Sequence, residues 1–239
     1  EKHMTKISSW SHSKLGEFDK CKYRTFLLHV AKIPEPQRPL PQGKTEHAND
    51  RGTRIHQAAE DYVRGLRDDI IPELQQFSSH IEMLAVLFKD GMVSMEGEWG
   101  LDETWTPTEW KKAWHRSKVD VIVHFDKVSA MVIDYKSGRK FGNEIKHGEQ
   151  MQLYAVNAFS RFPDLEAVTT ELWYVDQNQV TSVTFTRAQA LRFKPRFHSR
   201  GTALTSCVDW PANPNIFSCK WCMYGPWGSG DCKDGVRPG

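Results

Sequence analysis

Two acidic residues and a lysine have the types and spacing of a metal-dependent hydrolytic site. Asp120 interrupts one apolar run, residues 119–125, while Asp134 and Lys136 end the next, residues 131–136. Because side chains alternate faces along a strand, Asp134 and Lys136 are expected to share a face. The short connection predicts an antiparallel hairpin, in which a three-residue loop sets Asp120 opposite Asp134 and a five-residue loop sets it opposite Lys136. Either register brings the three charges together.

These charges need a partner if the hairpin is buried, because burying an unpaired charge costs several kcal/mol. Two carboxylates suit Mg²⁺ or Mn²⁺, which prefer oxygen ligands. Such an ion could activate water and neutralise charge on a phosphodiester, while Lys136 orients the water or stabilises the transition state. The structural alternative is a simple salt bridge between Lys136 and Asp120 or Asp134.

Three motifs in this order resemble the RecB-type exonuclease branch of the PD-(D/E)XK nuclease superfamily: Lys-Val-Asp120-Val-Ile-Val, Ile-Asp134-Tyr135-Lys136-Ser-Gly and Gln150-Met-Gln-Leu-Tyr154. The resemblance implies that Asp120 and Asp134 bind the metal, with Tyr135 as a further metal contact, and that Lys136 is catalytic. It also implies a helix beside the active site and the DNA that carries Gln150 and Tyr154 one turn apart. A tyrosine in the core with a glutamine at the surface is the alternative.

Two upstream positions extend this resemblance. The segment Arg51-Gly-Thr-Arg-Ile-His56 is similar to the family's Gly-x-x-x-His helix, whose histidine is an additional metal ligand. Glu60 lies one turn further on and could instead hydrogen-bond His56. The family often places an acidic residue on the strand before the first aspartate, and we choose Glu98 over Glu96 because its neighbours Trp99 and Leu101 occupy the opposite, core-facing side. A solvent-exposed glutamate on an edge strand is the ordinary alternative.

The chain has five cysteines, an odd number that argues against a disulfide framework and for metal ligation or burial. Cys219 and Cys222 form a Cys-x-x-Cys motif. With the other cysteines it resembles the pattern that binds a [4Fe–4S] cluster in the CRISPR adaptation nucleases and in AddB, where one N-terminal and three C-terminal cysteines are the ligands. The ligands implied are Cys21, Cys219, Cys222 and Cys232. The gap before Cys232 is longer than usual there, Cys207 is a competing ligand, and four thiolates also suit Zn²⁺. Cys207 is otherwise expected to be buried or reduced.

Hydrophobic periodicity and breakers predict the elements that must position these residues. We expect an α/β fold with a mixed central β-sheet flanked by helices (a restriction-endonuclease-like core), a helical N-terminal lobe and a Cys-rich C-terminal tail. One nuclease domain would span residues 5–239, with 5–31 and 205–239 together forming an iron–sulfur or zinc lobe. The predicted helices are a pair in 5–31, then 51–66, 71–89, 149–161 and 187–203, and the predicted strands are 93–101, 118–125, 130–136, 167–175 and 179–185.

Composition excludes some classes of protein and leaves others open. The net charge of +2 is too small to indicate a nucleic-acid binder by itself, although basic residues cluster at 136–146 and 187–200. The absence of a long apolar run or a secretory pattern predicts a protein without a membrane partner, in the cytoplasm of a bacterial cell or a phage-infected host. The expected partner is DNA with ends, single- or double-stranded. A helicase or recombination partner is possible, but this chain has no phosphate-binding Gly-x-x-x-x-Gly-Lys-Ser/Thr motif.

The sequence therefore predicts a metal-dependent DNA exonuclease acting in recombination, repair or phage DNA processing. A non-catalytic nucleic-acid-binding module with this fold is the first alternative, and the intact Asp120, Asp134 and Lys136 argue against it. A zinc-binding interaction protein is the second. Five aromatic residues near the C-terminus could stack on single-stranded bases, although packing is the expected role of most of them: Trp210, Phe217, Trp221, Tyr224 and Trp227.

Overall fold

A computed structural model describes residues 6–237 of the chain, apart from the side chain of Glu96. It divides into two compact units. The first, here called the terminal unit, joins the chain up to Pro39 with the chain from Arg196 onward, and the second, the sheet unit, spans Leu40–Pro195. No helix in residues 6–237 is both long enough and apolar enough to cross a membrane.

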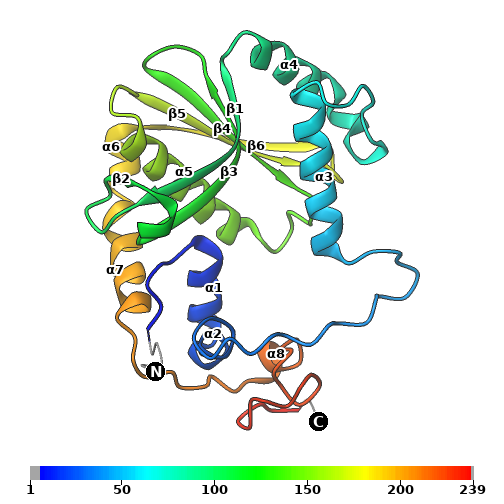
Figure 1. Ribbon diagram of the computed structural model, residues 1–239, viewed down its shortest axis with the longest axis vertical. Helices are drawn as coiled ribbons and strands as arrows, with labels where there is room; N and C mark the ends of the chain where they lie inside the picture. The colour runs from blue at the N-terminus through cyan, green and yellow to red at the C-terminus, as the bar shows by residue number, and fades with distance from the viewer. Residues whose placement is uncertain (1–5, 238–239) are drawn as a thin grey trace. The chain divides into compact units, whose positions relative to one another are not determined.

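The sheet unit contains a six-stranded mixed sheet in the order β2-β1-β3-β4-β5-β6 (Figure 1). Its strands are β1 (Val93–Leu101), β2 (Pro107–Thr108), β3 (His115–His124), β4 (Ser129–Lys136), β5 (Ala167–Tyr174) and β6 (Gln179–Thr186). Only β4 and β5 pair in parallel; the other neighbours are antiparallel. Since a parallel pair requires a crossover, the chain passes through helix α5 (Glu144–Arg161) between these two strands. The predicted mixed sheet flanked by helices is confirmed.

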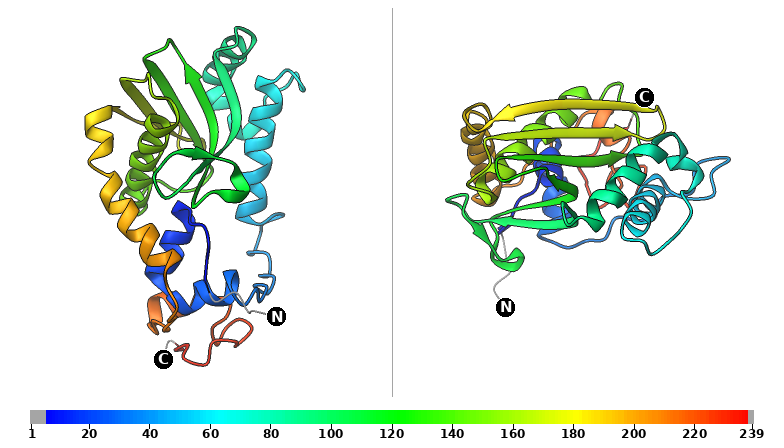
Figure 2. Two further views of the ribbon diagram at one scale, coloured as in Figure 1. Left: turned by 60° about the vertical axis from the view of Figure 1, so that its left-hand side comes forward. Right: turned by 90° about the horizontal axis from the view of Figure 1, so that it is seen from above.

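Helices cover both faces of the sheet, and alternate residues along each strand pack against different helices (Figures 1 and 2). Helix α3 (Ala48–Val63), the 3₁₀ helix η1 (Pro72–Phe77) and helix α4 (Ser78–Lys89) share one core cluster with alternate strand residues such as Val121, Ile133 and Trp173. On α5, Met151 clusters with Leu172 and Tyr174, which belong to the other set of alternate residues along the strands. This alternation decides which side chains meet α5.

The terminal unit contains helices α1 (His12–Lys20), α2 (Lys22–His29), α8 (Ile216–Cys219) and most of α7 (Lys194–Thr205). Its core includes the fully buried side chains of Trp10, Phe197 and Tyr224. The Tyr224 hydroxyl donates to the carbonyl of Ile33 at 2.5 Å, which joins the C-terminal segment to the N-terminal one. The first residue of the predicted lobe, Thr5, and the last two residues of the chain lie outside the described residues.

Several predicted boundaries were wrong, for local reasons. Helix α5 begins at Glu144 rather than at 149, because a buried contact of His147 holds its first turns in spite of Gly148. The helix predicted over 187–203 is two helices, α6 (Arg187–Leu191) and α7. Pro195 has no amide hydrogen to donate to the carbonyl four residues earlier, and it suits the first turn of a new helix. Strand β3 also begins three residues earlier than predicted, at His115.

Arg187 closes the connection between α5 and β5. Its guanidinium donates to four backbone carbonyls at 2.7–3.2 Å, those of Phe159, Phe162, Pro163 and Leu165. These carbonyls lie at the end of a helix and in the turn after it, where backbone donors are few; the Phe162 carbonyl also accepts from the Leu165 amide at 3.3 Å. Arg187, the first residue of the basic cluster at 187–200, therefore has a structural role.

We expect Arg187→Ala to destabilise the protein by roughly 2–3 kcal/mol, because hydrogen bonds to a charged group contribute more than neutral ones and four carbonyls lose a charged donor. Urea unfolding measures this loss. Arg67→Ala is the matched control, since Arg67 pairs with the exposed Asp69 and such a surface pair contributes at most about 1 kcal/mol. Equal destabilisation by the two variants would contradict a structural role for Arg187.

Candidate active site

The β3–β4 hairpin has the register of the shorter predicted loop. Val121 pairs with Ile133, and the Phe125 amide donates to the Ser129 carbonyl at the other end of the hairpin. Asp120 and Asp134 are the next positions beyond the Val121–Ile133 pair. There the Tyr135 amide donates to Asp120 Oδ2 at 2.9 Å. Asp120 is therefore bonded to the backbone of the strand that carries Asp134 and Lys136.

Asp134 and Lys136 meet the α5 pair, Gln150 and Tyr154, in one hydrogen-bonded network. Lys136 Nζ lies 2.6 Å from Asp134 Oδ2 and donates to Gln150 Oε1 at 2.7 Å. The Tyr154 hydroxyl donates to Asp134 Oδ1 at 2.6 Å and accepts from Gln150 Nε2 at 2.8 Å. Tyr154 and Asp134 are buried, whereas Lys136 is partly exposed. The structure thus brings these four predicted residues together.

His56 lies against Asp120 from the other side of the sheet. Its Nε2 is 3.0 Å from the Tyr135 carbonyl, and its Nδ1 is 3.1 Å from Asp120 Oδ1. The carbonyl can only accept, so Nε2 carries a proton. An ionised Asp120 can also only accept, so beside it Nδ1 carries a proton as well. His56 therefore contacts Asp120 and Tyr135, two of the predicted metal contacts, rather than Glu60, whose carboxylate pairs with Arg64.

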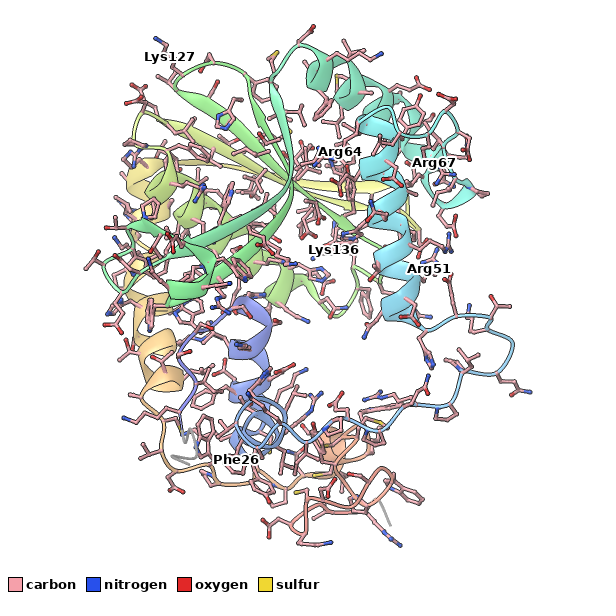
Figure 3. All side chains as sticks on the ribbon, viewed as in Figure 1. Phe26, Arg51, Arg64, Arg67, Lys127 and Lys136 are labelled. Carbon is pink, nitrogen blue, oxygen red and sulfur yellow. The ribbon has the colours of Figure 1, made fainter. Side chains whose placement is uncertain are left out.

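The start of α3 is tied to the ends of two central strands. Arg51 lies near the start of α3 (Figure 3). It donates to both carboxylate oxygens of Asp176, at 2.7 and 2.9 Å, and to the Ser137 carbonyl at 3.3 Å, so it joins the segments that follow β5 and β4. At Gly52 an added Cβ would come within 3.2 Å of Ser137 Oγ. The Arg-Gly pair thus lets α3 approach Lys136 closely enough to direct His56, one turn further on, at Asp120.

Burial and mutual charge shift the protonation of these groups. Burial raises the pKa of Asp120, and the charge of Asp134 raises it further, against the opposing effect of His56. For His56, burial favours the neutral ring, but the hydrogen bond to Asp120 and the charges of both aspartates outweigh it and raise its pKa. Burial and Asp134 also raise the pKa of Tyr154, which remains a neutral donor. Carboxylates that repel each other in a buried site are suited to a cation between them.

Sequence reasoning missed His147, a residue on the second turn of α5 that contacts β5 beside Lys136. Its Nδ1 is 2.8 Å from the Tyr174 hydroxyl. Burial, together with the positive charges of Lys136 and Lys146, lowers the pKa of His147 to about 4. The neutral ring therefore adds no charge beside Lys136. Its spacing of one turn before Gln150, on the helix face that meets the sheet, was the signal that could have identified it.

Glu98 lies at the same site but in a different environment. It lines a cavity of about 320 Å³ together with His56 and Asp120. Its carboxylate is exposed and is 3.5 Å from Lys118 Nζ, on the residue paired with it in β3. As predicted, Trp99 and Leu101 are buried. Glu98 is therefore placed near Asp120, and its nearest charged partner is Lys118. The side chain of Glu96 lies outside the described part of the structure.

The four predicted cluster cysteines line one cavity in the terminal unit, about 260 Å³ in volume: Cys21, Cys219, Cys222 and Cys232. Burial raises the pKa of Cys232, and the proximity of Cys21 and Cys222 adds to the shift. Cys207 does not line this cavity; its thiol lies 3.0 Å from the Asp209 carbonyl. None of the five cysteines forms a disulfide.

Within residues 6–237, no group of three or more His, Cys, Asp or Glu side chains is arranged to hold a metal ion as it stands. In the sheet unit, protonated partners occupy the acidic oxygens, His56 on Asp120 and Lys136 on Asp134. The available donors are nevertheless those a Mg²⁺ or Mn²⁺ ion prefers: two carboxylates, a backbone carbonyl and an imidazole. The residues fit a divalent cation by donor chemistry and by the repulsion that it would relieve.

A mixed sheet with helices on both faces, carrying Asp, Asp-x-Lys and Gln-x-x-x-Tyr at one end, is the arrangement of a nuclease of the restriction-endonuclease type. Residues 9–227 match the family model of the PD-(D/E)XK nuclease superfamily, and the chain belongs to that superfamily. No curated protein sequence matches the chain.

Two solved structures are similar to this chain at low sequence identity. A putative exonuclease from Eubacterium rectale is 10% identical, with a TM-score of 0.52 over 91% of this chain and 88% of that one. An alkaline exonuclease from Laribacter hongkongensis is 14% identical, with a TM-score of 0.34 over 85% of this chain and 89% of that one.

Proposed function

We propose that this protein is a Mg²⁺- or Mn²⁺-dependent DNA exonuclease of the RecB type, with its active site at Asp120, Asp134 and Lys136. The observation that carries the proposal is the network in which Lys136 Nζ lies between Asp134 and Gln150, at 2.6 and 2.7 Å, beside a second carboxylate. A structural salt bridge would need only one carboxylate. The additional aspartate, Asp120, is half-buried and is repelled by Asp134, which favours a site that holds a cation.

His56, Asp120, Asp134 and the backbone carbonyl of Tyr135 would hold the metal. When bound, a divalent cation supplies a Lewis acid that neutralises charge on the phosphodiester and lowers the pKa of a bound water. Tyr154 fixes Asp134 by its hydrogen bond to Oδ1. Gln150 holds the Lys136 ammonium in place, and that ammonium can donate to the attacking water or to a phosphate oxygen. Glu98, on the wall of the same cavity, can accept a proton from water.

Hydrolysis of end-labelled linear DNA, beside a covalently closed circle of the same sequence, tests the proposal. We expect loss of the linear DNA with Mg²⁺ or Mn²⁺, no loss with excess chelator, and survival of the circle. The requirement for ends rests on the resemblance of the motifs to RecB-type nucleases. Cleavage of the circle would replace the exonuclease with an endonuclease. An inactive protein with both metals would favour a nucleic-acid-binding module that keeps the fold.

We further propose that the four cysteines of the terminal unit bind a [4Fe–4S] cluster. The support is their position around one cavity, with Cys219 and Cys222 linked by a turn in which the Cys222 amide donates to the Cys219 carbonyl at 3.1 Å. A cluster held by Cys21 and the three C-terminal cysteines would covalently join the two ends of the chain that form this unit. Zn²⁺ is the alternative metal for the same thiolates.

Metal analysis of protein purified without oxygen distinguishes these cases. We expect about four iron atoms and four acid-labile sulfides per chain, a broad visible absorption band, and loss of both in Cys222→Ser. Cys207→Ser is the matched control and should keep the iron, because Cys207 lies outside the cavity. Zinc without sulfide would contradict the cluster, and equal iron loss in the two variants would contradict the ligand assignment.

A further inference from the structure

Two large apolar side chains project into solvent near the start of α5, one from the turn before the helix and one from its first turn. Phe141 is 89% exposed and Ile145 is 85% exposed. Leaving such side chains in water forgoes roughly 1.5–3 kcal/mol of burial each. Single exposed apolar residues are common. Here an aromatic and an aliphatic residue are exposed four positions apart, just after the strand that carries Lys136, where they could contact a bound substrate.

The backbone holds Phe141 in a defined turn. The Asn143 amide donates to the Lys140 carbonyl at 3.0 Å, and the Asn143 side chain donates to the Arg139 carbonyl at 2.9 Å. Gly142 follows Phe141 with φ of 82°, the left-handed value that the third position of a type II turn requires. Phe141 therefore occupies the outer corner of this turn, and Ile145 follows on the first turn of α5.

The surroundings of this apolar tip, Phe141 and Ile145, suit a negatively charged partner. The segment 136–149 has four basic and two acidic residues. Lys140 Nζ lies 5.7 Å from the ring centre of Tyr174, the residue paired with Lys136 in the parallel strands. Lys146 is near enough to His147 to lower its pKa. Positive charge thus extends from Lys136 to both sides of the tip.

We propose that Phe141 stacks on an unpaired nucleobase of the DNA strand held in the active site, with Ile145 covering the next base and the flanking cations contacting phosphates. This inference rests on the proposed nuclease function and deepens it, because it names a single-stranded DNA segment as the form of substrate at the site. Aromatic stacking combined with positive charge is the general way in which proteins hold single strands without sequence preference. An acidic protein surface would satisfy the charges but would not use a lone exposed aromatic ring on a fixed turn.

Fluorescence of 2-aminopurine tests the stacking directly. The probes are single-stranded oligonucleotides of about 12 nucleotides, one labelled near each end, bound to the full-length protein with Ca²⁺ in place of Mg²⁺ to prevent cleavage. We expect wild type to quench one probe on binding. Phe141→Ala should abolish the quenching and weaken binding by about 5- to 100-fold, while Phe141→Trp restores both. Phe125→Ala is the matched control, since Phe125 is also exposed but lies at the other end of β4.

The outcomes separate this inference from the proposed function. Quenching and affinity that are unchanged in Phe141→Ala, in a protein that degrades linear DNA, would overturn the stacking role alone, and the tip would then be a contact for another protein. A similar loss in Phe125→Ala would also overturn it. A wild-type protein that neither binds the oligonucleotides nor cleaves linear DNA would overturn both proposals.

Discussion

Lys136→Ala is expected to lower the rate of DNA hydrolysis by roughly 100- to 1000-fold, the usual effect of removing one preorganised donor to the reacting charge. Asp134 and Gln150 hold the Lys136 ammonium in place, so the substitution removes a donor whose position is already fixed. Initial rates on end-labelled linear DNA at saturating Mn²⁺ measure the effect.

Lys127→Ala is the matched control for this variant. Lys127 lies in the exposed turn between β3 and β4, at the end of the hairpin opposite Lys136 (Figure 3). We expect its rate to stay within about twofold of wild type. If Lys136→Ala kept wild-type activity while remaining folded, the assigned site would be wrong, and the nuclease activity would have to be sought elsewhere in the chain.

Asp120→Asn is expected to abolish both hydrolysis and stabilisation by metal, without unfolding the metal-free protein. The asparagine oxygen can still accept from the Tyr135 amide, and its NH₂ group can donate to Nδ1 of a neutral His56, whose Nε2 still donates to the Tyr135 carbonyl. Every hydrogen bond is kept and only the charge is lost. The substitution therefore isolates the role of Asp120 as a ligand.

Thermal unfolding with increasing Mn²⁺ measures this difference. At about 100 times its Kd, a bound ion stabilises wild type by about 2.7 kcal/mol, which is roughly 5–10 °C in Tm for a chain of this length. Asp120→Asn should show almost none of this shift, whereas Asp68→Asn, at an exposed position outside the site, should show all of it. A full Mn²⁺ shift in Asp120→Asn would remove that residue from the metal site.

Much of the sheet unit could be predicted from the sequence because its strands and helices differ in hydrophobic period. Alternation along residues 119–136 was enough to place Asp120, Asp134 and Lys136 together in either register. The register itself could not be read, because it depends on whether Phe125 and Ser129 pair or belong to the loop. The structure has them paired, which leaves three residues in the turn.

The contacts of the polar residues were less predictable than their positions. Nothing in the spacing indicates that Gln150 bonds to Lys136 rather than to solvent, since that depends on how α5 lies against β4. His147 was missed because Gly148 disfavours a helix, so the helix was predicted to begin after it and its first turns were left out. The tail aromatics were assigned mainly to packing, yet Phe217, Trp221 and Trp227 are exposed at 77%, 66% and 63%, and only Tyr224 is fully buried. Composition cannot separate these cases.

The alternation of side chains across β3 and β4 limits which length changes the gene can tolerate. Inserting one codon within either strand would exchange the two faces beyond it, sending Ile133 and its neighbours into the place of the aspartates and the charges into the apolar layer. An insertion in the turn at 126–128 would leave both faces as they are. We therefore expect natural variation in length among relatives to be concentrated in this turn and to be absent from the strands on either side of it.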